Sequence, residues 1–434
     1  MSSEQLKSFL ESKPLYYKEI DHERVHKAYD ILKSHIRRPR TVHIVGTNGK
    51  GSTGRILAHL AFSFQHPKGI CPSGRARSTL SIGHFSSPHI LKFNERIWID
   101  GSDASDEILE EAHQKLFSIL GKEMSDDLTY FEYTTLLAFV VFENCDLMVL
   151  EAGLGGEFDA TNVCDKELSV ITPIGIDHQA FLGQSIEEIA ATKIRSIQKR
   201  VLLAPQVYDE VVEVAKDISA QKGAELFLNE KFSRSTSPEV ECIENFDKEL
   251  KLNNVQRSVY VTPQERWNEV LVKLQRIAKE KTWSDYLVDN ASVALQALDM
   301  LEIKYNINDL KSLELFGRFY AFTDNIRIDV GHNPLAARAI EKTLDEKIVL
   351  IYNSLDDKEY EEVLRILKPK VKRVEIIAID SQRAMTLDAI ENALDKVGLT
   401  YGYYKGDIDK NEKYLVFGSF YVVEEFLKKN NVSK

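Results

Sequence analysis

The sequence predicts an α/β fold in which a doubly wound, largely parallel sheet is followed by a second, smaller α/β domain. Thr41–Val45 is a short β-branched run that leads through a glycine-interrupted turn into a helical pattern at Thr53–Leu60. Continuous apolar strands at Asp146–Leu150 and Leu168–Thr172 are typical of a sheet that is covered on both faces. A further series of strands begins near residue 326 and predicts the second domain.

The remaining elements are predicted from the same periodicities. Residues 1–40 have an amphipathic helical pattern, and helices are expected at Phe131–Phe142 and Ser185–Ile197. From about residue 200 to 280 the patterns are weaker. We place the domain boundary near residue 310, which gives domains of residues 1–310 and 311–434. The strands expected in the second domain are Ile326–Val330, Lys347–Tyr352, Val374–Ile379 and Tyr414–Phe417.

Composition excludes several classes of protein. The chain has 434 residues, of which 43% are hydrophobic and 28% charged, and this is typical of a globular protein. Its net charge of −11 is spread without a basic stripe, which disfavours a nucleic-acid partner. The longest near-apolar run, Thr134–Phe142, is shorter than the roughly 20 residues that a membrane span needs. The four cysteines show no metal-type spacing, which suits a reducing compartment, so we expect a cytoplasmic protein.

A phosphate-binding loop is predicted at Gly46–Ser52, between the first strand and its helix. Successive backbone N–H groups and a helix N-terminus form an anion cradle there. Lys50 can meet the β- and γ-phosphates, and the Ser52 hydroxyl can bind a Mg²⁺ that bridges them. The loop departs from the GxxxxGK[ST] pattern, because Gly51 separates Lys50 from Ser52. The alternative is a tight turn with an incidental lysine.

Polar residues after two other strands extend this prediction. Glu151 ends a buried strand and is placed to offer an oxygen to Mg²⁺, although a solvated strand-end acid is the alternative. The following glycines do not complete a dinucleotide-binding fingerprint, since position 158 is Phe158. His178 either coordinates a metal or caps the sheet edge. On periodicity alone, Lys193 is expected to be a solvated helix residue.

Several motifs occur together and in a specific order. They are VGTNGKGST, FSSPHILKFNERI (85–97), TYFEYTT (129–135), LEAGLGGEFDATN (150–162), GIDHQAFLG (175–183), DNASVALQAL (289–298), FGRF (316–319), DVGHNP (329–334) and GSFY (418–421). In this combination the chain resembles the bacterial folylpolyglutamate synthases, often bifunctional with dihydrofolate synthase, of the Mur-ligase superfamily. The resemblance implies a P-loop ATPase domain followed by a Rossmann-like domain, with ATP between them.

The resemblance also implies roles for individual residues. Catalytic roles fall on Lys50, Lys193, which would be carbamylated, and His332. ATP would be bound by Thr47, Asn48, Gly49, Lys50, Gly51, Ser52, Asn290, Arg318 and Asp329. Two Mg²⁺ sites would use Ser52, Ser87, Glu151 and His178. Dihydropteroate would contact Thr129, Tyr130, Phe131, Glu132, Phe158, Asp159 and Ala160, with a weaker match at Glu19–His22.

The implied activity is an ATP-dependent ligation of L-glutamate to dihydropteroate and to reduced folates, through an acyl phosphate and in a monomer. The sequence departs from the family pattern at Glu157, Thr192 and Asp289, and a Pro/Gly/Arg-rich segment, Gln65–Thr79, lengthens the usual spacing between Ser52 and Ser87. One alternative is a UDP-N-acetylmuramoyl-type amino-acid ligase. Another is a P-loop switch ATPase, although no NKxD-type base-recognition segment is present.

Overall fold

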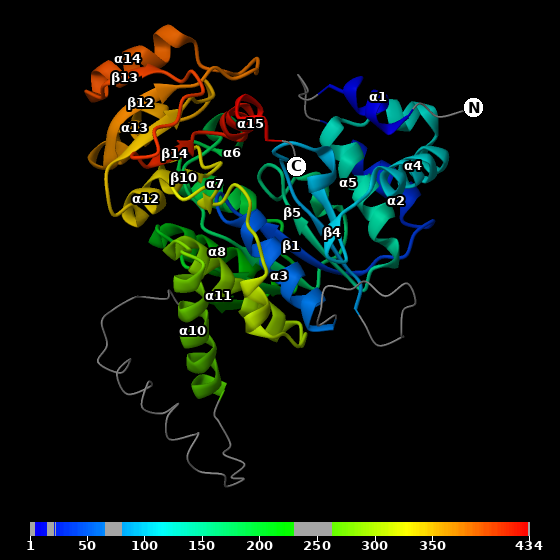
Figure 1. Cartoon of the computed structure of the whole chain (residues 1–434). Coiled ribbons are helices and arrows are strands. Elements are labelled where there is room, and N and C mark those ends of the chain that lie inside the picture. The colour runs from blue at the N-terminus through cyan, green and yellow to red at the C-terminus, as the bar shows by residue number, and fades with distance from the viewer. Residues whose placement is uncertain (1–4, 15–20, 22, 66–79, 230–262, 433–434) are drawn as a thin grey trace.

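The chain is built around two twisted sheets, one in each part of the sequence (Figure 1). The computed structural model describes residues 5–14, 21, 23–65, 80–229 and 263–432. Apart from Asp21 and Gln65, the segments Glu19–His22 and Gln65–Thr79 therefore lie outside the described residues. None of the helices within these ranges is long and apolar enough to cross a bilayer.

The first sheet is mainly parallel. In the described residues its eight strands have the order β4-β3-β2-β5-β1-β6-β7-β8, and only β3 and β4 run antiparallel to their neighbours. The strands are β1 (Arg40–Val45), β2 (Ile82–Phe85), β3 (Ile97–Ile99), β4 (Ser102–Asp103), β5 (Leu147–Glu151), β6 (Leu168–Ile171), β7 (Arg200–Leu203) and β8 (Glu225–Leu228).

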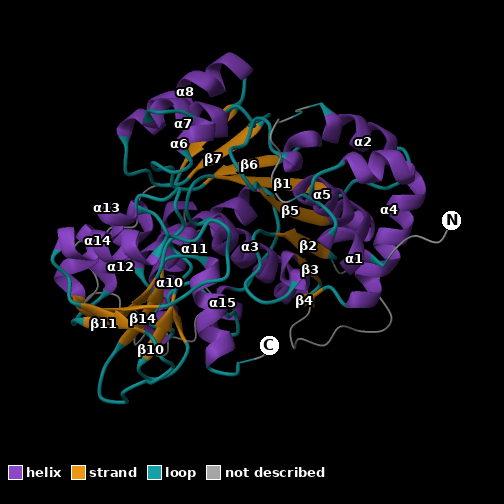
Figure 2. Cartoon of the chain, turned by 90° about the horizontal axis from the view of Figure 1, so that it is seen from above, coloured by secondary structure: helices purple, strands orange, loops and turns teal. Residues whose placement is uncertain are grey.

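Helices cover both faces of this sheet, as Figure 2 shows. One face packs against α3 (Lys50–Gln65), α10 (Pro263–Glu280) and α11 (Asp285–Met300). The opposite face packs against α1 (Leu6–Glu11), α2 (Arg24–Leu32), α4 (Asp106–Asp127), α5 (Tyr130–Val141), α6 (Gln179–Leu182), α7 (Ile186–Ile194) and α8 (Asp209–Lys222). Burial on both faces explains why the central strands are continuously apolar.

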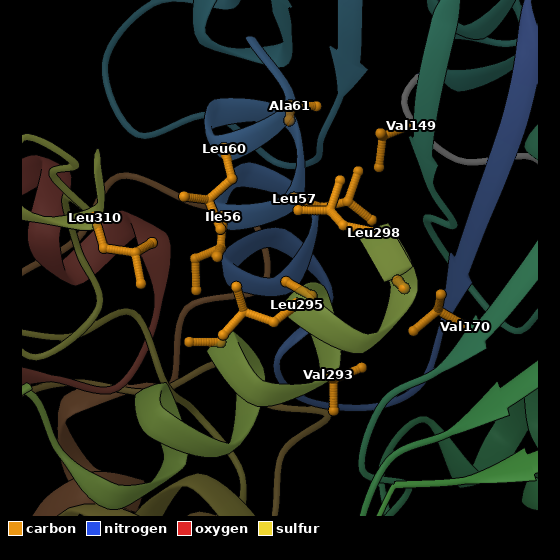
Figure 3. Close-up of a cluster of buried hydrophobic side chains, with 14 of the residues drawn as sticks. Ile56, Leu57, Leu60, Ala61, Val149, Val170, Val293, Leu295, Leu298 and Leu310 are labelled. Carbon is orange, nitrogen blue, oxygen red and sulfur yellow. The ribbon is translucent and has the colours of Figure 1, made fainter. Parts of the chain in front are cut away.

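The core between α3, α11 and the sheet fixes the position of the loop that precedes α3. Ile56, Leu57 and Leu60 of α3 pack with Leu295 and Leu298 of α11, and the sheet contributes Val149 and Val170 (Figure 3). These side chains are fully buried, and each stabilises the fold by roughly 1.5–3 kcal/mol relative to exposure. The start of α3 is therefore held rigidly at the end of β1.

The second sheet has the order β13-β12-β11-β14-β10-β9 within the described residues, and only β9 is antiparallel to its neighbour. Its strands are β9 (Tyr320–Ala321), β10 (Ile326–Ile328), β11 (Ile348–Tyr352), β12 (Val371–Ile376), β13 (Tyr401–Tyr403) and β14 (Tyr414–Phe417). Its helices are α12 (Pro334–Thr343), α13 (Tyr360–Leu367), α14 (Leu387–Val397) and α15 (Phe420–Lys429).

The predicted α/β order of both parts is confirmed, with differences in detail. Strand β12 begins at Val371, before the predicted start at Val374, and both ends are shifted toward the N-terminus. The short strands β2, β3, β4, β9 and β13 and the strands β7 and β8 were not predicted. Leu313 and Leu315 still pack in the core of the first sheet, whereas Phe319 packs in the core of the second. The chain therefore passes from one core to the other shortly after the proposed boundary near residue 310.

Candidate active site

The loop between β1 and α3 is fixed by contacts with the end of β6. The N–H groups of Thr47 and Asn48 both donate to the Pro173 carbonyl, at 2.9 and 3.1 Å. Gly49 has a φ of +87°, and a Cβ at this position would lie 2.6 Å from Oδ1 of Asn290. Only glycine fits such a turn without strain. The backbone is thus shaped into a tight turn at the N-terminus of a helix, where anions bind.

The first residues of α3 face both this turn and α11. Lys50 Nζ donates to the carbonyls of Gly46 and Thr47, at 3.2 and 3.3 Å, so its ammonium lies over the turn. Ser52 is 2% exposed, and its hydroxyl donates to the Gly49 carbonyl at 3.1 Å. Asn290 of α11 donates to that same hydroxyl at 2.8 Å. The predicted nucleotide residues Gly49, Ser52 and Asn290 are therefore brought together.

A buried acid, Glu151, lies beside the first turn of α3. Glu151, at the end of β5, is 4% exposed, and Ser87 N–H donates to its Oε2 at 3.2 Å. Burial raises the pKa of Glu151, whereas the charges of Lys50 and Arg318 act to lower it. Its nearest ion pair, with Lys50, is long at 4.0 Å. A buried carboxylate whose ion pair with Lys50 is this long is a fitting ligand for a divalent ion, since Mg²⁺ prefers oxygen ligands.

Arg318 of the second domain reaches the same point. A Cβ on Gly51 would lie 3.2 Å from Oε2 of Glu151 and 3.3 Å from Nη2 of Arg318. Lys50, Glu151 and Arg318 therefore converge around the first turn of α3. The Arg318 guanidinium also lies 5.3 Å from the centre of the Phe420 ring, which holds it by a cation–π contact.

The domains meet at a cluster of charged and polar side chains centred on Asp177. This carboxylate accepts from Lys358 Nζ at 2.8 Å and Asn333 Nδ2 at 3.3 Å, and His332 Nε2 lies 3.6 Å away. Burial acts to raise the pKa of Asp177, but His332, Lys358 and His178 together hold it well below its usual range. Asp177 therefore binds the second domain as an anion.

His178, a predicted metal ligand, contacts the same lysine. Its Nε2 lies 3.1 Å from Lys358 Nζ, and burial, with a contribution from Lys358, lowers the pKa of His178 to about 4. The ring is therefore neutral near pH 7 and accepts from the ammonium. The structure brings Ser87 beside Glu151, whereas His178 is held by Lys358. The described residues contain no group of three or more His, Cys, Asp or Glu side chains arranged to hold a metal.

Asp329 connects the second domain to α11. It accepts from the Tyr286 hydroxyl at 2.7 Å and from the N–H groups of Phe319 and Gly331 at 2.8 and 2.7 Å. Burial raises the pKa of Asp329, and these donors oppose that shift. A cavity of about 1030 Å³ adjoins this region between α10, α11 and the second domain, and its lining includes Asp285, Val288, Asp289, Phe319 and Arg327.

Lys193 is buried, so the expectation of a solvated side chain from periodicity is wrong. It is 4% exposed, and its Nζ donates to the Gly46 carbonyl at 3.1 Å. Burial, with a contribution from Lys50, lowers its pKa to about 7. The reason is tertiary packing: a Cβ on Gly156 would lie 2.3 Å from the Lys193 carbonyl, so the glycine-rich loop presses directly on α7.

Comparison with known proteins identifies the family. A solved structure of Helicobacter pylori folylpolyglutamate synthetase is 34% identical to this chain, covers 98% of both chains and has a TM-score of 0.69. The chain belongs to the folylpolyglutamate synthase family. A dihydrofolate synthase/folylpolyglutamate synthase of Haemophilus influenzae is 27% identical over 437 residues, which span 89% of this chain and 88% of that protein. No protein-family model matches.

A further structure supports the fold alone. A bifunctional folylpolyglutamate synthase/dihydrofolate synthase of Yersinia pestis, complexed with AMPPNP and a Mn ion, is 24% identical, covers 99% of both chains and has a TM-score of 0.74. The predicted Mur-ligase-like arrangement of two α/β domains is therefore confirmed.

In this family member, part of the predicted dihydropteroate surface is occupied by local structure. Thr129 caps α5 by accepting from Glu132 N–H at 2.9 Å, and Glu132 accepts from Thr129 N–H at 2.8 Å. Glu132 also pairs with Arg24 at 3.0 Å in a buried ion pair. Tyr130 and Phe131 are half-buried instead. A Cβ on Gly153 would lie 2.5 Å from the Phe131 ring, so this helix start touches the loop that carries Phe158, Asp159 and Ala160.

Within that loop, Phe158 is 55% exposed, while Asp159 and Ala160 are 5% exposed each. The structure also places in the candidate site residues that sequence reasoning missed. Asp177 stands next to the predicted His178, and that adjacency was the available signal. Lys358 and Tyr286 lie in segments that carry no motif, so only the tertiary fold reveals their contacts with Asp177 and Asp329.

Proposed function

We propose that this chain is an ATP-dependent ligase that adds L-glutamate to dihydropteroate and to reduced folates. The Haemophilus influenzae relative is named for both activities, and the Helicobacter pylori relative for the second. The observation that carries the proposal is the convergence of Lys50, Glu151 and Arg318 at the start of α3. Membership of this family favours a folate ligase over a muramoyl-type ligase or a P-loop switch ATPase.

The phosphates of ATP would lie in the turn before α3, with adenosine toward the cavity beside Asp289 and Phe319. Lys50 and Arg318 supply positive charge to the oxygens of the γ-phosphoryl as it moves to the carboxylate of the pteroate. The acyl phosphate that results is attacked by the glutamate amine. The C–N bond forms, inorganic phosphate leaves and the amine gives up a proton. His332, from the second domain, would lie near the transferred group.

The residues present fit a divalent cation at Glu151. We propose that Glu151, Ser87 and Ser52 hold Mg²⁺, with a second ion near His178 once that ring leaves Lys358. The ion would supply charge neutralisation for the triphosphate. Glu151 keeps a carboxylate at the place where the polyphosphate would approach, and Ser87 N–H orients it. Lys50 is then free to follow the γ-phosphoryl.

We further propose that Lys193 is carbamylated. A lysine whose pKa is about 7 is partly neutral at neutral pH, and a neutral amine adds to CO₂ to give a carbamate and a proton. The carbamate of Lys193 would place a negative charge between the loop of residues 46–52 and the side chains around Asp177. The enzyme is also proposed to act as a cytoplasmic monomer.

Phosphate release tests this function. Purified protein with Mg-ATP and L-glutamate is expected to release phosphate when dihydropteroate is added, and not when glutamate is omitted. Release with tetrahydrofolate but not with dihydropteroate would restrict the enzyme to polyglutamylation. No release with either acid would contradict the proposal.

A further inference from the structure

His43 is a buried polar residue in the middle of β1 that the proposed chemistry does not use. It is fully buried, and the two-residue period of the strand places it on the face opposite Val42 and Ile44. Its Nε2 lies 2.8 Å from Oγ1 of Thr161, just after the glycine-rich loop. Its Nδ1 has no hydrogen-bond partner among the described residues.

Thr161 connects His43 to Asp159 by hydrogen bonds. The Thr161 hydroxyl donates to Oδ1 of Asp159 at 2.6 Å, and its N–H donates to the same oxygen at 3.0 Å. The other oxygen, Oδ2, accepts from Leu154 N–H at 2.8 Å. Donors therefore surround the carboxyl group, which organises its own turn; burial raises the pKa of Asp159, and these donors act to lower it.

When Asp159 is ionised, this network fixes the tautomer of His43. The Thr161 hydroxyl has one hydrogen, which it gives to Asp159, so it can only accept from the imidazole. His43 therefore carries its hydrogen on Nε2, and the chain of donors runs from Nε2–H to Oγ1–H to Oδ1. Burial, together with the charge of Lys166, keeps the pKa of His43 well below its usual range, so the ring stays neutral.

The same turn is held from its other side. Asn162 donates to the Glu157 carbonyl at 2.7 Å, and Lys166 Nζ contacts the Asn162 side-chain oxygen and the Ser196 carbonyl. Glu157 N–H donates to the Thr192 carbonyl at 3.0 Å, next to Lys193. The loop thus joins β1 to the helix that carries Lys193.

We infer that His43 is a positioning residue for the acid substrate: through Thr161 and Asp159 it holds the 153–162 loop in the shape that presents Phe158 to the pteroate. The inference rests on the proposed function. It gives the Asp159 side chain a part in supporting the loop, because its oxygens accept from Thr161 and from Leu154 N–H. Phe158 lies on the same turn and is 55% exposed.

Two pairs of variants test the inference by steady-state phosphate release. In His43→Leu and Thr161→Val the donor chain is broken, whereas in His43→Gln an amide N–H can reach the position of Nε2 and in Thr161→Ser the hydroxyl remains. We expect the first two to raise KM for dihydropteroate roughly tenfold or more, with KM for ATP changed less than about twofold. The conservative variants should stay within about threefold of wild type.

Ser169→Ala is the matched control. Ser169 is the cross-strand neighbour of His43 on β6 and is buried, and its hydroxyl has no hydrogen-bond partner among the described residues. The Ser169→Ala variant should leave the KM values for ATP and for dihydropteroate unchanged. If His43→Leu fails to fold, the Thr161 pair decides the question.

Three results would overturn the inference. In the first, the KM values for ATP and for dihydropteroate rise together. In the second, His43→Gln has the same KM for dihydropteroate as His43→Leu, and Thr161→Ser the same as Thr161→Val. In the third, all of the variants match wild type. In each of these the wild-type enzyme is active, so the proposed function survives. A wild-type enzyme without activity toward either acid would instead contradict the proposed function, and the inference with it.

Discussion

Asp177 of the first domain and Lys358 of the second form a 2.8 Å ion pair across the boundary between the two sheets. The side chains are 8% and 3% exposed, so both charges are removed from water and depend on each other. His178, His332 and Asn333 surround the pair. This contact links the loop after β6 to the second domain, and it brings the predicted catalytic His332 to the first.

Replacing Lys358 with methionine should therefore be costly. Lys358→Met leaves Asp177 buried with weaker partners, and we expect a loss of about 3 kcal/mol in the free energy of unfolding. Lys396→Met is the control, because Lys396 pairs with Glu361 at 65% exposure, where ion pairs contribute little. Denaturant unfolding of both variants measures the difference, and equal stability of the two would contradict this account of the boundary.

Glu151→Gln should separate stability from activity. Burial raises the pKa of Glu151, which means that the ionised carboxylate is less stable in the folded protein than in the unfolded chain. The amide keeps an oxygen for Ser87 N–H, so we expect the melting temperature to be unchanged or higher. Phosphate release should fall at least roughly a hundredfold, because a neutral amide binds Mg²⁺ weakly. A variant that keeps its activity would remove Glu151 from the metal site.

Lys50→Ala should abolish turnover with little effect on folding. Among the residues that the structure describes, the ammonium donates to the carbonyls of Gly46 and Thr47 and lies 4.0 Å from Oε1 of Glu151. Losing it should change the melting temperature by a few degrees at most, whereas transfer of the γ-phosphoryl loses its nearest cation. Thermal unfolding and phosphate release on one preparation make the comparison. Unaltered activity would exclude Lys50 from the mechanism.

The lowered pKa of Lys193 predicts that the stability of the protein depends on pH. Its pKa is about 7 in the folded protein and near 10.5 in the unfolded chain, so between these values the unfolded chain binds more protons. Its contribution is therefore most destabilising below pH 7 and disappears as the pH rises toward 10.5. In CO₂-free buffer, the stability of wild type should rise relative to Lys193→Met across this range. A constant difference would contradict the lowered pKa.

Carbamylation of Lys193 has its own test. Added bicarbonate should raise wild-type activity more at pH 8 than at pH 6.5, because the neutral amine reacts with CO₂. Short carboxylic acids should partly restore the activity of Lys193→Ala by supplying the missing negative charge. Rescue of Lys50→Ala by the same acids would show that the effect is not specific to Lys193.

Local patterns were enough to predict the central strands β1, β5 and β6 and the helix that follows β1, because the strands are buried on both faces and consist mostly of apolar residues. The loop residues Gly49 and Ser52 were also predicted, since a glycine turn before a helix has a clear signature. Short edge strands such as β3 and β13 carry too few residues for a period to be visible.

Burial and interdomain contacts could not be predicted in the same way. Periodicity placed Lys193 in solvent, because a helix pattern does not reveal that a distant glycine loop covers its polar face. Asp177 and Lys358 are far apart in the sequence, and only the arrangement of the two sheets brings them together. Thr129 and Glu132 match a family motif, yet their side chains cap α5.

The position of the triphosphate tests the central claim most directly. A crystal structure with a non-hydrolysable ATP analogue and Mg²⁺ should show the phosphates in the turn formed by residues 46–52, with Lys50 and Arg318 on the terminal phosphate and Glu151 facing the ion. A nucleotide bound elsewhere, or phosphates that contact neither Lys50 nor Arg318, would contradict the account.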